Sequence, residues 1–499
     1  MSIPALIDRR ADVFSESEDT ERMSSGNPEV DHILGGGFPS NSINIIMGHP
    51  GSGKTILAEQ LIFHNAADDR PILYFTTLSE PLAKVVRYLQ SFSFYDEAKL
   101  GTQVVYEDVG PQLARDGAPA LVPLLQDAIL TLAPKIIVID SFKAVHDLAP
   151  SIAERRRMVY EMTALLSAYG TTAFLLGEYT EDDILSYPEF AVADSIVELS
   201  RRRLGNRDER YFRVYKLRGS RYLEGAHAFR ITNSGLDVYP RLVSPRMPEG
   251  YEPVSERIST GVGGLDAMLD GGLWRGTTTL LAGPSGAGKT TIGLQFALEG
   301  ARQGEPTLYM SFQENPTQLM RTIRGLGVDL EQFQAQGLDL VYASPVELQI
   351  DSIIVDLFRR IEQRGIRRLV LDAVGDLASA ATDPQRLHDY LYALVQHFAV
   401  RTITSVLNFE TTGNAVATTG AQMQNAMSYL SDNVLLLTVE GEERTRRSLR
   451  VLKTRGSGHD TQVREVEIGP RGLSVPMGAR PGASAGASVG TGARGGAQP

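Results

Sequence analysis

Short, continuously apolar runs alternate with longer stretches of helical periodicity along most of the chain. Continuous runs, as opposed to alternating ones, predict strands that are buried on both faces of a parallel sheet. The fold class is therefore α/β, with a twisted, mainly parallel sheet and helices on both of its faces. The predicted strands lie at 43–47, 71–76, 135–139, 172–176 and 195–199 in the first half, and at 279–282, 307–311, 368–371, 401–407 and 433–437 in the second half.

The two halves of the chain repeat each other at an offset of about 235 residues. Residues 48–55 (GHPGSGKT) recur as residues 283–290 (GPSGAGKT). Near the end of each half, residues 216–220 (KLRGS) match residues 453–457 (KTRGS) at an offset of 237. Self-similarity over this length predicts two tandem domains that arose by duplication.

Composition changes mark the expected domain limits. Residues 243–254 contain several prolines and lack apolar periodicity, which is typical of a linker. The last residues have too few large apolar side chains to offset the entropy of ordering, so they predict a disordered tail. We expect a flexible leader at 1–20, a first domain at 21–242, a linker at 243–254, a second domain at 255–475 and a Gly/Ala/Ser-rich tail at 476–499.

Composition and charge exclude several classes of function. The 499-residue chain has no cysteine, which excludes disulfides and thiolate zinc sites and favours a cytoplasmic location. No apolar run approaches ~18 residues, so the sequence predicts no membrane-spanning helix. The formal net charge of −11 argues against binding along a nucleic-acid backbone.

The repeated GxxxxGK[ST] segments each follow an apolar run and precede a helical pattern, which is the context that a phosphate-binding loop requires. The glycines let backbone N–H groups surround phosphate oxygens, the lysine reaches the β- and γ-phosphates, and the last hydroxyl supplies an oxygen to Mg²⁺. The sequence therefore predicts two sites for ATP and Mg²⁺. The predicted loop residues are Gly48, Gly51, Ser52, Gly53, Lys54, Thr55, Gly283, Gly286, Ala287, Gly288, Lys289, Thr290 and Thr291.

Carboxylates follow the predicted strands near each loop. Asp140 and Asp372 end apolar runs, so we expect each to hold Mg²⁺ through water together with Thr55 or Thr290. The alternative is an aspartate that caps the following helix. Hydrolysis also needs a residue that orients or deprotonates the nucleophile. Glu80 and Glu314 follow equivalent strands and are the candidate bases, although a glutamate in such a position is often a solvated surface residue.

A basic pair lies late in each half on a strand pattern. Lys216 and Arg218 are two residues apart, as are Lys453 and Arg455, so each pair projects from one face of its strand. One interpretation is a solvated basic edge. The other is a finger that completes the ATP site of a neighbouring subunit and compensates γ-phosphate charge, which predicts a ring with ATP at its subunit interfaces.

The tandem arrangement, both phosphate-binding loops and the two KxRGS segments resemble the KaiC family of RecA-like ATPases over residues 21–475, most closely at 452–460 (LKTRGSGHD). The resemblance implies two tandem RecA-like P-loop NTPase domains, a two-tier homohexamer, slow ATP hydrolysis and signalling proteins as partners. It also implies that the second tier transfers phosphate to its own residues. The further nucleotide-contacting residues that it implies are Lys216, Leu217, Arg218, Arg447, Lys453, Thr454, Arg455 and His459.

The chain departs from the family pattern at several positions. The adjacent Ser-Thr pair that the family phosphorylates corresponds here to Ser428 and Tyr429, so Ser428 is the candidate phosphorylation site. The family's paired glutamates are replaced by Ser79-Glu80 and Gln313-Glu314, and the tail shows no segment resembling the family's regulatory peptide. Two alternatives to a KaiC-like switch remain: a DNA-handling motor like RecA or DnaB, and a nucleotide-gated scaffold with negligible turnover.

Overall fold

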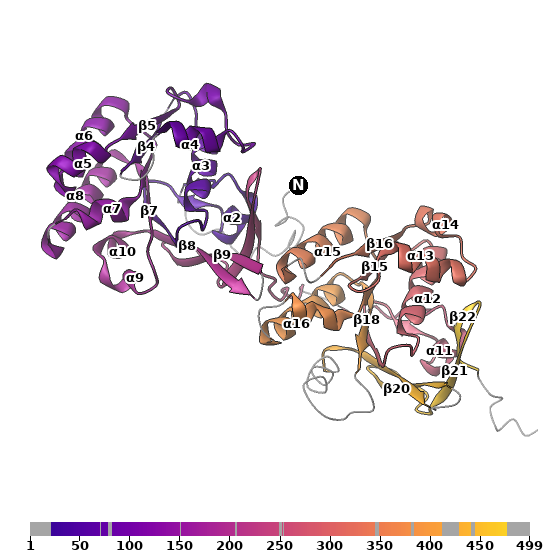
Figure 1. Cartoon of the computed structure of the whole chain (residues 1–499). Coiled ribbons are helices and arrows are strands. Elements are labelled where there is room, and N and C mark those ends of the chain that lie inside the picture. Colours follow the sequence, from indigo (N-terminus) through magenta and orange to yellow (C-terminus); the bar gives the residue numbers. More distant parts are fainter. Residues whose placement is uncertain are drawn as a thin grey trace, which may run out of the picture. The chain divides into compact units, whose positions relative to one another are not determined.

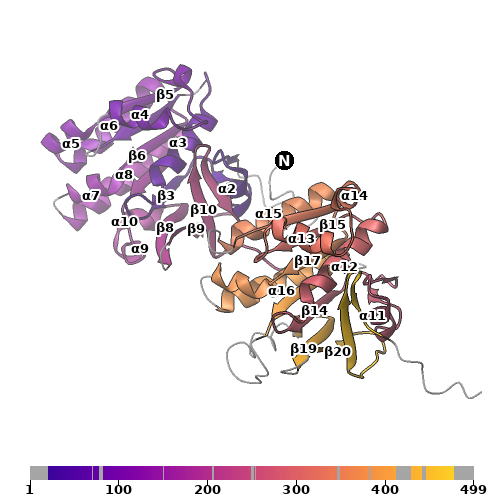
Figure 2. The ribbon, with the colours of Figure 1, turned by 45° about the vertical axis from the view of Figure 1, so that its right-hand side comes forward.

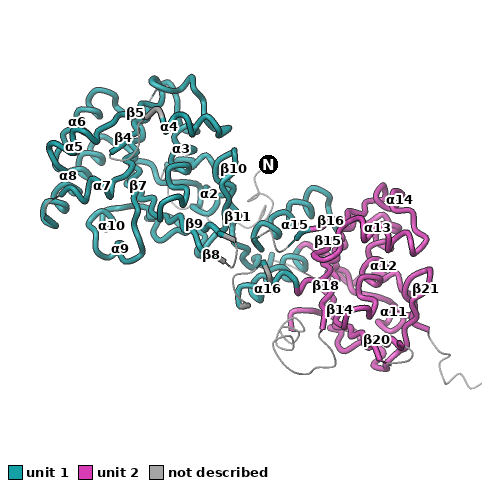
Figure 3. Tube along the Cα trace, in the orientation of Figure 1, with its two compact units in different colours: residues 1–251, 343–366, 376–400 teal, residues 252–342, 367–375, 401–499 magenta. Residues whose placement is uncertain are grey.

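The computed structural model describes residues 21–69, 71–77, 82–149, 151–204, 207–248, 252, 254–344, 349–380, 384–411, 429–440 and 445–476. The predicted leader and residues 477–499 of the predicted tail lie outside these ranges. The chain divides into two compact units, one of residues 1–251, 343–366 and 376–400, the other of residues 252–342, 367–375 and 401–499 (Figure 3). The domain limits expected from the sequence remain a prediction.

The described part of the first unit contains a nine-stranded sheet of order β11-β10-β9-β8-β3-β7-β6-β4-β5. Five of its strands, β4, β5, β7, β8 and β9, are labelled in Figure 1. The strands from β8 to β5 in this order pair in parallel, and β9, β10 and β11 extend the sheet antiparallel beyond β8. The strands are β3 (Ile43–Met47), β4 (Ile72–Thr76), β5 (Val104–Asp108), β6 (Ile136–Asp140), β7 (Thr172–Gly177), β8 (Ser195–Leu204), β9 (Arg207–Leu217), β10 (Ala226–Thr232) and β11 (Gly235–Tyr239).

Helices cover both faces of this sheet because successive side chains of the buried strands point to opposite sides. Ile46 packs in one core cluster with Leu57 and Leu61, whereas its neighbour Ile45 packs in another cluster with Met162. The helices are α2 (Pro28–Ile33), α3 (Lys54–Asn65), α4 (Leu82–Leu89), α5 (Gly110–Asp116), α6 (Leu121–Leu132), α7 (Phe142–Asp147), α8 (Ile152–Tyr169), α9 (Asp183–Ser186) and α10 (Pro188–Val192).

The second sheet, of order β16-β15-β17-β18-β14-β19-β20-β21-β22 in the described residues, matches the first strand for strand. In both sheets the strand before the phosphate-binding loop is central, and α12 packs against β15 and β17 (Figure 2). The strands are β14 (Thr278–Gly283), β15 (Thr307–Ser311), β16 (Leu338–Tyr342), β17 (Arg368–Asp372), β18 (Thr404–Glu410), β19 (Asn433–Glu440), β20 (Arg446–Thr454), β21 (Arg464–Gly469) and β22 (Gly472–Ser474).

The remaining elements complete the duplicated pattern. The small strands β1 (Arg22–Met23) and β2 (Phe38–Pro39) pair before the first loop, as β12 (Arg257–Ile258) and β13 (Leu273–Trp274) do before the second. The helices of this half are α11 (Gly263–Met268), α12 (Lys289–Arg302), α13 (Pro316–Gly325), α14 (Leu330–Ala335), α15 (Ile350–Arg364) and α16 (Pro384–Val400). Matching strand order in the two sheets confirms the prediction of tandem RecA-like P-loop domains.

Two of these helices group with the first unit. α15 contacts β10 and β11, and Val355 on α15 joins a small apolar cluster with Tyr211 and Tyr239. Arg386 on α16 donates a hydrogen bond to the hydroxyl oxygen of Tyr211 (3.2 Å) and pairs with the buried Asp351 at the start of α15. None of the helices in the described ranges is long and apolar enough to cross a membrane.

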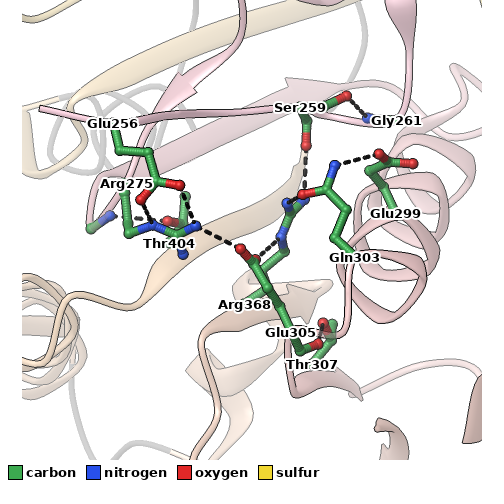
Figure 4. A network of polar contacts seen from close by, with 11 residues as sticks. Glu256, Ser259, Gly261, Arg275, Glu299, Gln303, Glu305, Thr307, Arg368 and Thr404 are labelled. Carbon is green, nitrogen blue, oxygen red and sulfur yellow. Dashed lines mark hydrogen bonds and ion pairs between the residues drawn. The ribbon is translucent and has the colours of Figure 1, made fainter. Parts of the chain in front are cut away.

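A network of charged groups around the buried Arg368 lies at the amino end of the second sheet (Figure 4). Arg368, the first residue of β17, is fully buried and donates hydrogen bonds to Glu305 (2.5 Å), the carbonyl oxygen of Ser259 (2.7 Å) and Gln303 (3.0 Å). Arg275 donates to the same Glu305 carboxylate at 2.6 Å. This network lies opposite the strand ends that carry the phosphate-binding loop, so it stabilises the sheet and does not contact the candidate site.

Candidate functional site

Each phosphate-binding loop joins the central strand of its sheet to a helix that begins at the loop lysine. Gly53 and Gly288, immediately before α3 and α12, have φ values of 109° and 108°. This region of backbone conformation favours glycine, so the sequence pattern and the turn agree. The first N–H groups of each helix remain available at the loop, where they attract anionic oxygens.

The loop lysines and one buried hydroxyl fit a phosphate ligand. Lys54 Nζ donates to the carbonyl oxygens of Gly48 (2.9 Å) and His49 (3.1 Å), and Lys289 contacts two loop carbonyls in the same way, each at 2.8 Å. Ser52 Oγ is buried without a hydrogen-bond partner among the described residues. A bound phosphate oxygen would give this hydroxyl a hydrogen-bond partner, and a buried hydroxyl without a partner costs free energy.

The threonine and the strand-end aspartate meet in both units, and their role as Mg²⁺ ligands stays a prediction. Thr55 Oγ1 donates to Asp140 Oδ2 at 2.9 Å, and Thr290 Oγ1 donates to Asp372 Oδ2 at 3.0 Å. Hydroxyl and carboxylate oxygens are ligands that Mg²⁺ prefers, and a Mg²⁺ bound to phosphates needs few protein ligands. The described part of the chain contains no group of three or more His, Cys, Asp or Glu side chains that could hold a metal ion.

A tyrosine that the sequence analysis missed holds each of these aspartates. The hydroxyl of Tyr74 donates to Asp140 Oδ2 at 2.8 Å, and that of Tyr309 donates to Asp372 Oδ2 at 2.5 Å. Both tyrosines are buried, and burial together with the nearby aspartate raises their pKa well above its usual value. Both hydroxyls therefore remain protonated donors. Their spacing of 235 residues is that of the loops, a signal that could have identified them.

A cavity opens beside each loop, of about 620 Å³ in the first unit and about 300 Å³ in the second. Glu314 lines the second cavity, and its Oε2 is buried without a hydrogen-bond partner in the described residues. Burial, and then the charge of Asp372, raises the pKa of Glu314. Such a carboxylate can accept a proton from water near the γ-phosphate position. Its counterpart Glu80 lies outside the described residues.

A second carboxylate that the sequence analysis missed faces each loop. Glu178 and Glu410 line the two cavities just after β7 and at the end of β18. Burial lowers the pKa of Lys54, and the charges of Glu178 and then Asp140 offset part of this shift. Burial also lowers the pKa of Lys289, and there Glu410 and then Asp372 offset part of the shift. Glu178 and Glu410 are 232 residues apart, the spacing of the strand-end aspartates, so a search at that offset could have found them.

The basic pairs lie away from the cavity of their own unit. Neither pair is among the described residues that line the cavities. Lys216 Nζ donates to the carbonyl oxygen of Phe190 (3.3 Å), and Lys453 Nζ donates to that of Ser431 (2.7 Å). The side chains of Arg218 and Arg455 are 56% and 57% exposed. The lysine of each pair therefore contacts the chain just before β8 or β19, and the arginine of each pair is about half exposed.

The other predicted nucleotide contacts occupy different places. Arg447 Nε donates to the carbonyl oxygen of Gly286 at 2.9 Å, so this arginine contacts the loop of its own unit. Thr454 Oγ1 and His459 Nδ1 are 2.5 Å apart, beside the second basic pair. Leu217 is the last residue of β9 and is buried. The predicted phosphorylation site, Ser428, lies outside the described residues.

Comparison with known proteins agrees with this geometry. A family model described as "ATPase: KaiC" matches residues 23–243 and again residues 258–479. A circadian clock oscillator protein KaiC from Picosynechococcus is 29% identical over 463 residues, which cover 89% of this chain and 88% of that protein. The KaiC of Rippkaea orientalis is 28% identical over 483 residues (93% and 91%), and KaiC 1 of Synechocystis is 27% identical over 490 residues (95% and 92%).

Proposed function

This chain belongs to the KaiC family of ATPases, and we propose that it is an ATP-hydrolysing switch that assembles as a homohexamer with ATP at its subunit interfaces. One observation carries the proposal: each unit has a complete phosphate-binding site, whereas its basic pair lies outside that cavity with a half-exposed arginine. A cation in this position can serve an adjacent subunit, where it compensates charge that develops on the γ-phosphate.

Each residue of the site then has a distinct role. The loop N–H groups and Lys54 or Lys289 bind the phosphates, and Thr55 with Asp140, or Thr290 with Asp372, would hold Mg²⁺. The ion supplies charge neutralisation on the phosphate oxygens when it is bound. Glu80 and Glu314 orient and deprotonate the attacking water. Arg218 and Arg455 act on the neighbouring subunit's ATP.

Mixed rings test the contribution of the arginine across the interface. In a Lys54→Ala background, which silences the first site, Arg455→Ala rings should lose turnover by about 10³-fold or more with little change in ATP affinity. Rings mixed with Lys289→Ala subunits should recover activity, because some interfaces then combine an intact loop with an intact finger. An absence of recovery, with assembly intact, would contradict the proposal.

A second activity, transfer of phosphate to Ser428, is favoured by one contact. Arg455 Nη2 donates to the carbonyl oxygen of Tyr429 at 3.0 Å, so the residue that follows Ser428 lies on the proposed finger. A hydroxyl held near a γ-phosphate gains effective concentration and needs only a weak base. Mass spectrometry after incubation with Mg²⁺ and ATP should find phosphate on Ser428, and none in the Lys289→Ala and Ser428→Ala variants. If no phosphate is found on this segment of the wild-type protein, the proposed phosphate transfer is contradicted and only ATP hydrolysis remains as the proposed activity.

The alternative functions make different predictions for a single turnover of radiolabelled ATP. A KaiC-like switch releases phosphate without added DNA, whereas a motor like RecA or DnaB is stimulated by DNA. A nucleotide-gated scaffold binds ATP and releases no phosphate. The net charge of −11 favours the switch over the motor. Signalling proteins are the candidate partners of a switch whose ring changes with its nucleotide.

A further inference from the structure

An aspartate in the first unit connects two parts of the proposed mechanism. Asp194 Oδ2 accepts a hydrogen bond from the backbone N–H of Ile43, the first residue of the strand that leads to the phosphate-binding loop (3.0 Å). Asp194 Oδ1 accepts from Arg218 Nη1 at 3.4 Å, and the backbone N–H of Arg218 donates to the carbonyl oxygen of Asp194 at 2.8 Å. Arg218 Nη2 also donates to the carbonyl oxygen of Ala191 at 3.2 Å.

The same set of contacts recurs in the second unit. Asp432 Oδ2 accepts from the backbone N–H of Thr278, at the start of β14 (2.9 Å). Asp432 Oδ1 lies 3.7 Å from Arg455 Nη1, and the backbone N–H of Arg455 donates to the carbonyl oxygen of Asp432 at 3.0 Å. Arg455 Nη2 donates to Tyr429, three residues before the aspartate, just as Ala191 lies three residues before Asp194.

The burial of the partners shows which of them is held in place. The side chains of Asp194 and Asp432 are 29% and 26% exposed, about half the exposure of Arg218 and Arg455. An ion pair at such a surface contributes little to stability, so its repetition in both units is not explained by folding. The aspartate uses one carboxylate oxygen for the strand and the other for the arginine, and the arginine keeps donors available for a further acceptor.

We propose that Asp194 and Asp432 are positioning residues. Each fixes the orientation of its subunit's arginine finger relative to the strand that carries the same subunit's phosphate-binding loop. The inference rests on the proposed function, because it assumes that Arg218 and Arg455 act on a neighbouring subunit. It adds that the finger of each subunit is aligned by a carboxylate outside every ATP cavity described above.

The substitution Asp432→Asn separates the two contacts of the carboxylate. The amide oxygen of asparagine still accepts from the N–H of Thr278, so β14 keeps its anchor, whereas the charged contact with Arg455 is lost. In the Lys54→Ala background we expect turnover to fall by about tenfold or more, with ATP affinity unchanged. Asp270→Asn is the matched control, because Asp270 pairs with Arg257 in the same unit at 3.6 Å and should leave turnover unchanged.

Mixing subunits reveals where the defect acts. If Asp432 acts through the finger, Asp432→Asn subunits should recover activity with Lys289→Ala subunits, which supply an intact finger, and not with Arg455→Ala subunits. Recovery with Arg455→Ala subunits would show that Asp432 serves only its own loop, and unchanged turnover of Asp432→Asn would show that it serves neither. Either result overturns the inference.

The mixture of Arg455→Ala with Lys289→Ala subunits distinguishes this inference from the proposed function. If that mixture stays inactive, the finger does not act between subunits and the proposed function fails first. If it recovers and the Asp432→Asn pattern is absent, only the positioning role fails. Asp194→Asn in a Lys289→Ala background repeats the test in the first unit, should Asp432→Asn assemble poorly.

Discussion

The strand-end aspartates have different partners in the two units, although their loops match closely. Asp140 Oδ2 accepts from Thr55 and Tyr74. Asp372 has the corresponding threonine and tyrosine and a third donor, Asn408, whose Nδ2 lies 2.7 Å from Oδ1. The position equivalent to Asn408 in the first sheet is occupied by an apolar residue, Leu176. The carboxylate of the second unit is therefore held more firmly.

Removal of the tyrosine hydroxyl should weaken the proposed Mg²⁺ site without removing any ligand. Outer hydrogen bonds orient a metal-binding carboxylate, and their loss costs roughly 10- to 100-fold in metal affinity. We expect Tyr309→Phe to raise the Mg²⁺ concentration that half-saturates binding of a fluorescent ATP analogue by about tenfold. Tyr342→Phe, a change at an exposed tyrosine on the edge strand β16, is the control. Equal Mg²⁺ requirements in the two variants would contradict the role of the hydroxyl.

Glu59 makes the stability of the first unit depend on pH. This α3 residue is fully buried, accepts a hydrogen bond from Tyr106 on Oε2, and has an Oε1 without a partner among the described residues. Burial raises its pKa from 4.5 to about 8. Between these pH values the unfolded chain releases a proton that the folded chain keeps, so stability falls as pH rises by about 1.4 kcal/mol per pH unit.

Glu59→Gln should abolish that pH dependence, because the amide does not ionise. Hydrogen exchange of peptides from α3, corrected for intrinsic rates, should show wild-type protection falling from pH 5 to pH 8 and a flatter profile for the variant. The equivalent residue of the second unit is Leu294, so peptides from α12 provide an internal control. Parallel profiles for wild type and variant would show that Glu59 is ionised in the folded protein.

Sequence reasoning proposed the residues whose chemistry depends on local spacing. The loop glycines, the lysines and the aspartates at the ends of apolar runs all follow from short segments, and in the structure Thr55 lies against Asp140. It missed Tyr74 and Glu178, which reach the site from strands that are distant in the sequence. Their relevance depends on the register between β4, β6 and β7, which no local pattern specifies.

At the scale of elements, the buried strands were predictable and the edge strands were not. All ten predicted runs contribute to strands, although the run at 401–407 forms a strand only from Thr404, which then continues to Glu410. The edge strands β5 and β16 were missed because they are only partly buried, so they lack a continuous apolar run. The antiparallel strands β10, β11, β21 and β22 lie beyond the parallel core. They were missed because polar residues interrupt their apolar positions, as Asp237 does in β11 and Glu467 does in β21.

Substitution of Arg368, the buried arginine of β17, tests how the second sheet is stabilised. Burial alone would raise the pKa of Glu305, and the hydrogen bonds from Arg275 and Arg368 outweigh it, so the net shift is downward. Removing Arg368 takes away the three hydrogen bonds of a buried guanidinium group, whereas Glu305 keeps its ion pair with Arg275. Because a hydrogen bond that involves a charged group contributes roughly 1.5–3 kcal/mol, we expect Arg368→Met to lower the free energy of unfolding by about 3 kcal/mol.

The sole tryptophan of the chain, Trp274, lies on β13 in the second unit and reports unfolding there by its fluorescence. The neighbouring Arg367 is exposed, so Arg367→Met is the matched control and should unfold at the wild-type denaturant concentration. Identical unfolding of Arg368→Met and Arg367→Met would show that the network contributes nothing.

At the scale of the whole molecule, duplication preserved the site and allowed its surroundings to diverge. Strand order, loops, aspartates and basic pairs match between the two halves. Glu59 corresponds to Leu294, and the buried Arg368 corresponds to Ile136. The loops, aspartates and basic pairs would face nucleotide or a neighbouring subunit, whereas the divergent positions include a core residue, Arg368, and a cavity-lining residue, Glu59. Selection on an assembly would leave this pattern, which leads to the last prediction.

The proposed ring should form when nucleotide binds. A ligand shared between two subunits stabilises their contact by mass action, so a non-hydrolysable ATP analogue with Mg²⁺ should convert the protein into a hexamer. Light scattering coupled to size exclusion should then give the mass of six chains of 54.4 kDa. The variant with both Lys54→Ala and Lys289→Ala has the same surface and binds the phosphates poorly. On its own, without subunits that bind nucleotide, it should therefore remain dissociated under the same conditions. A wild-type protein that stays monomeric at tens of micromolar with saturating analogue would remove the basis for placing Arg218 and Arg455 at a neighbour's ATP.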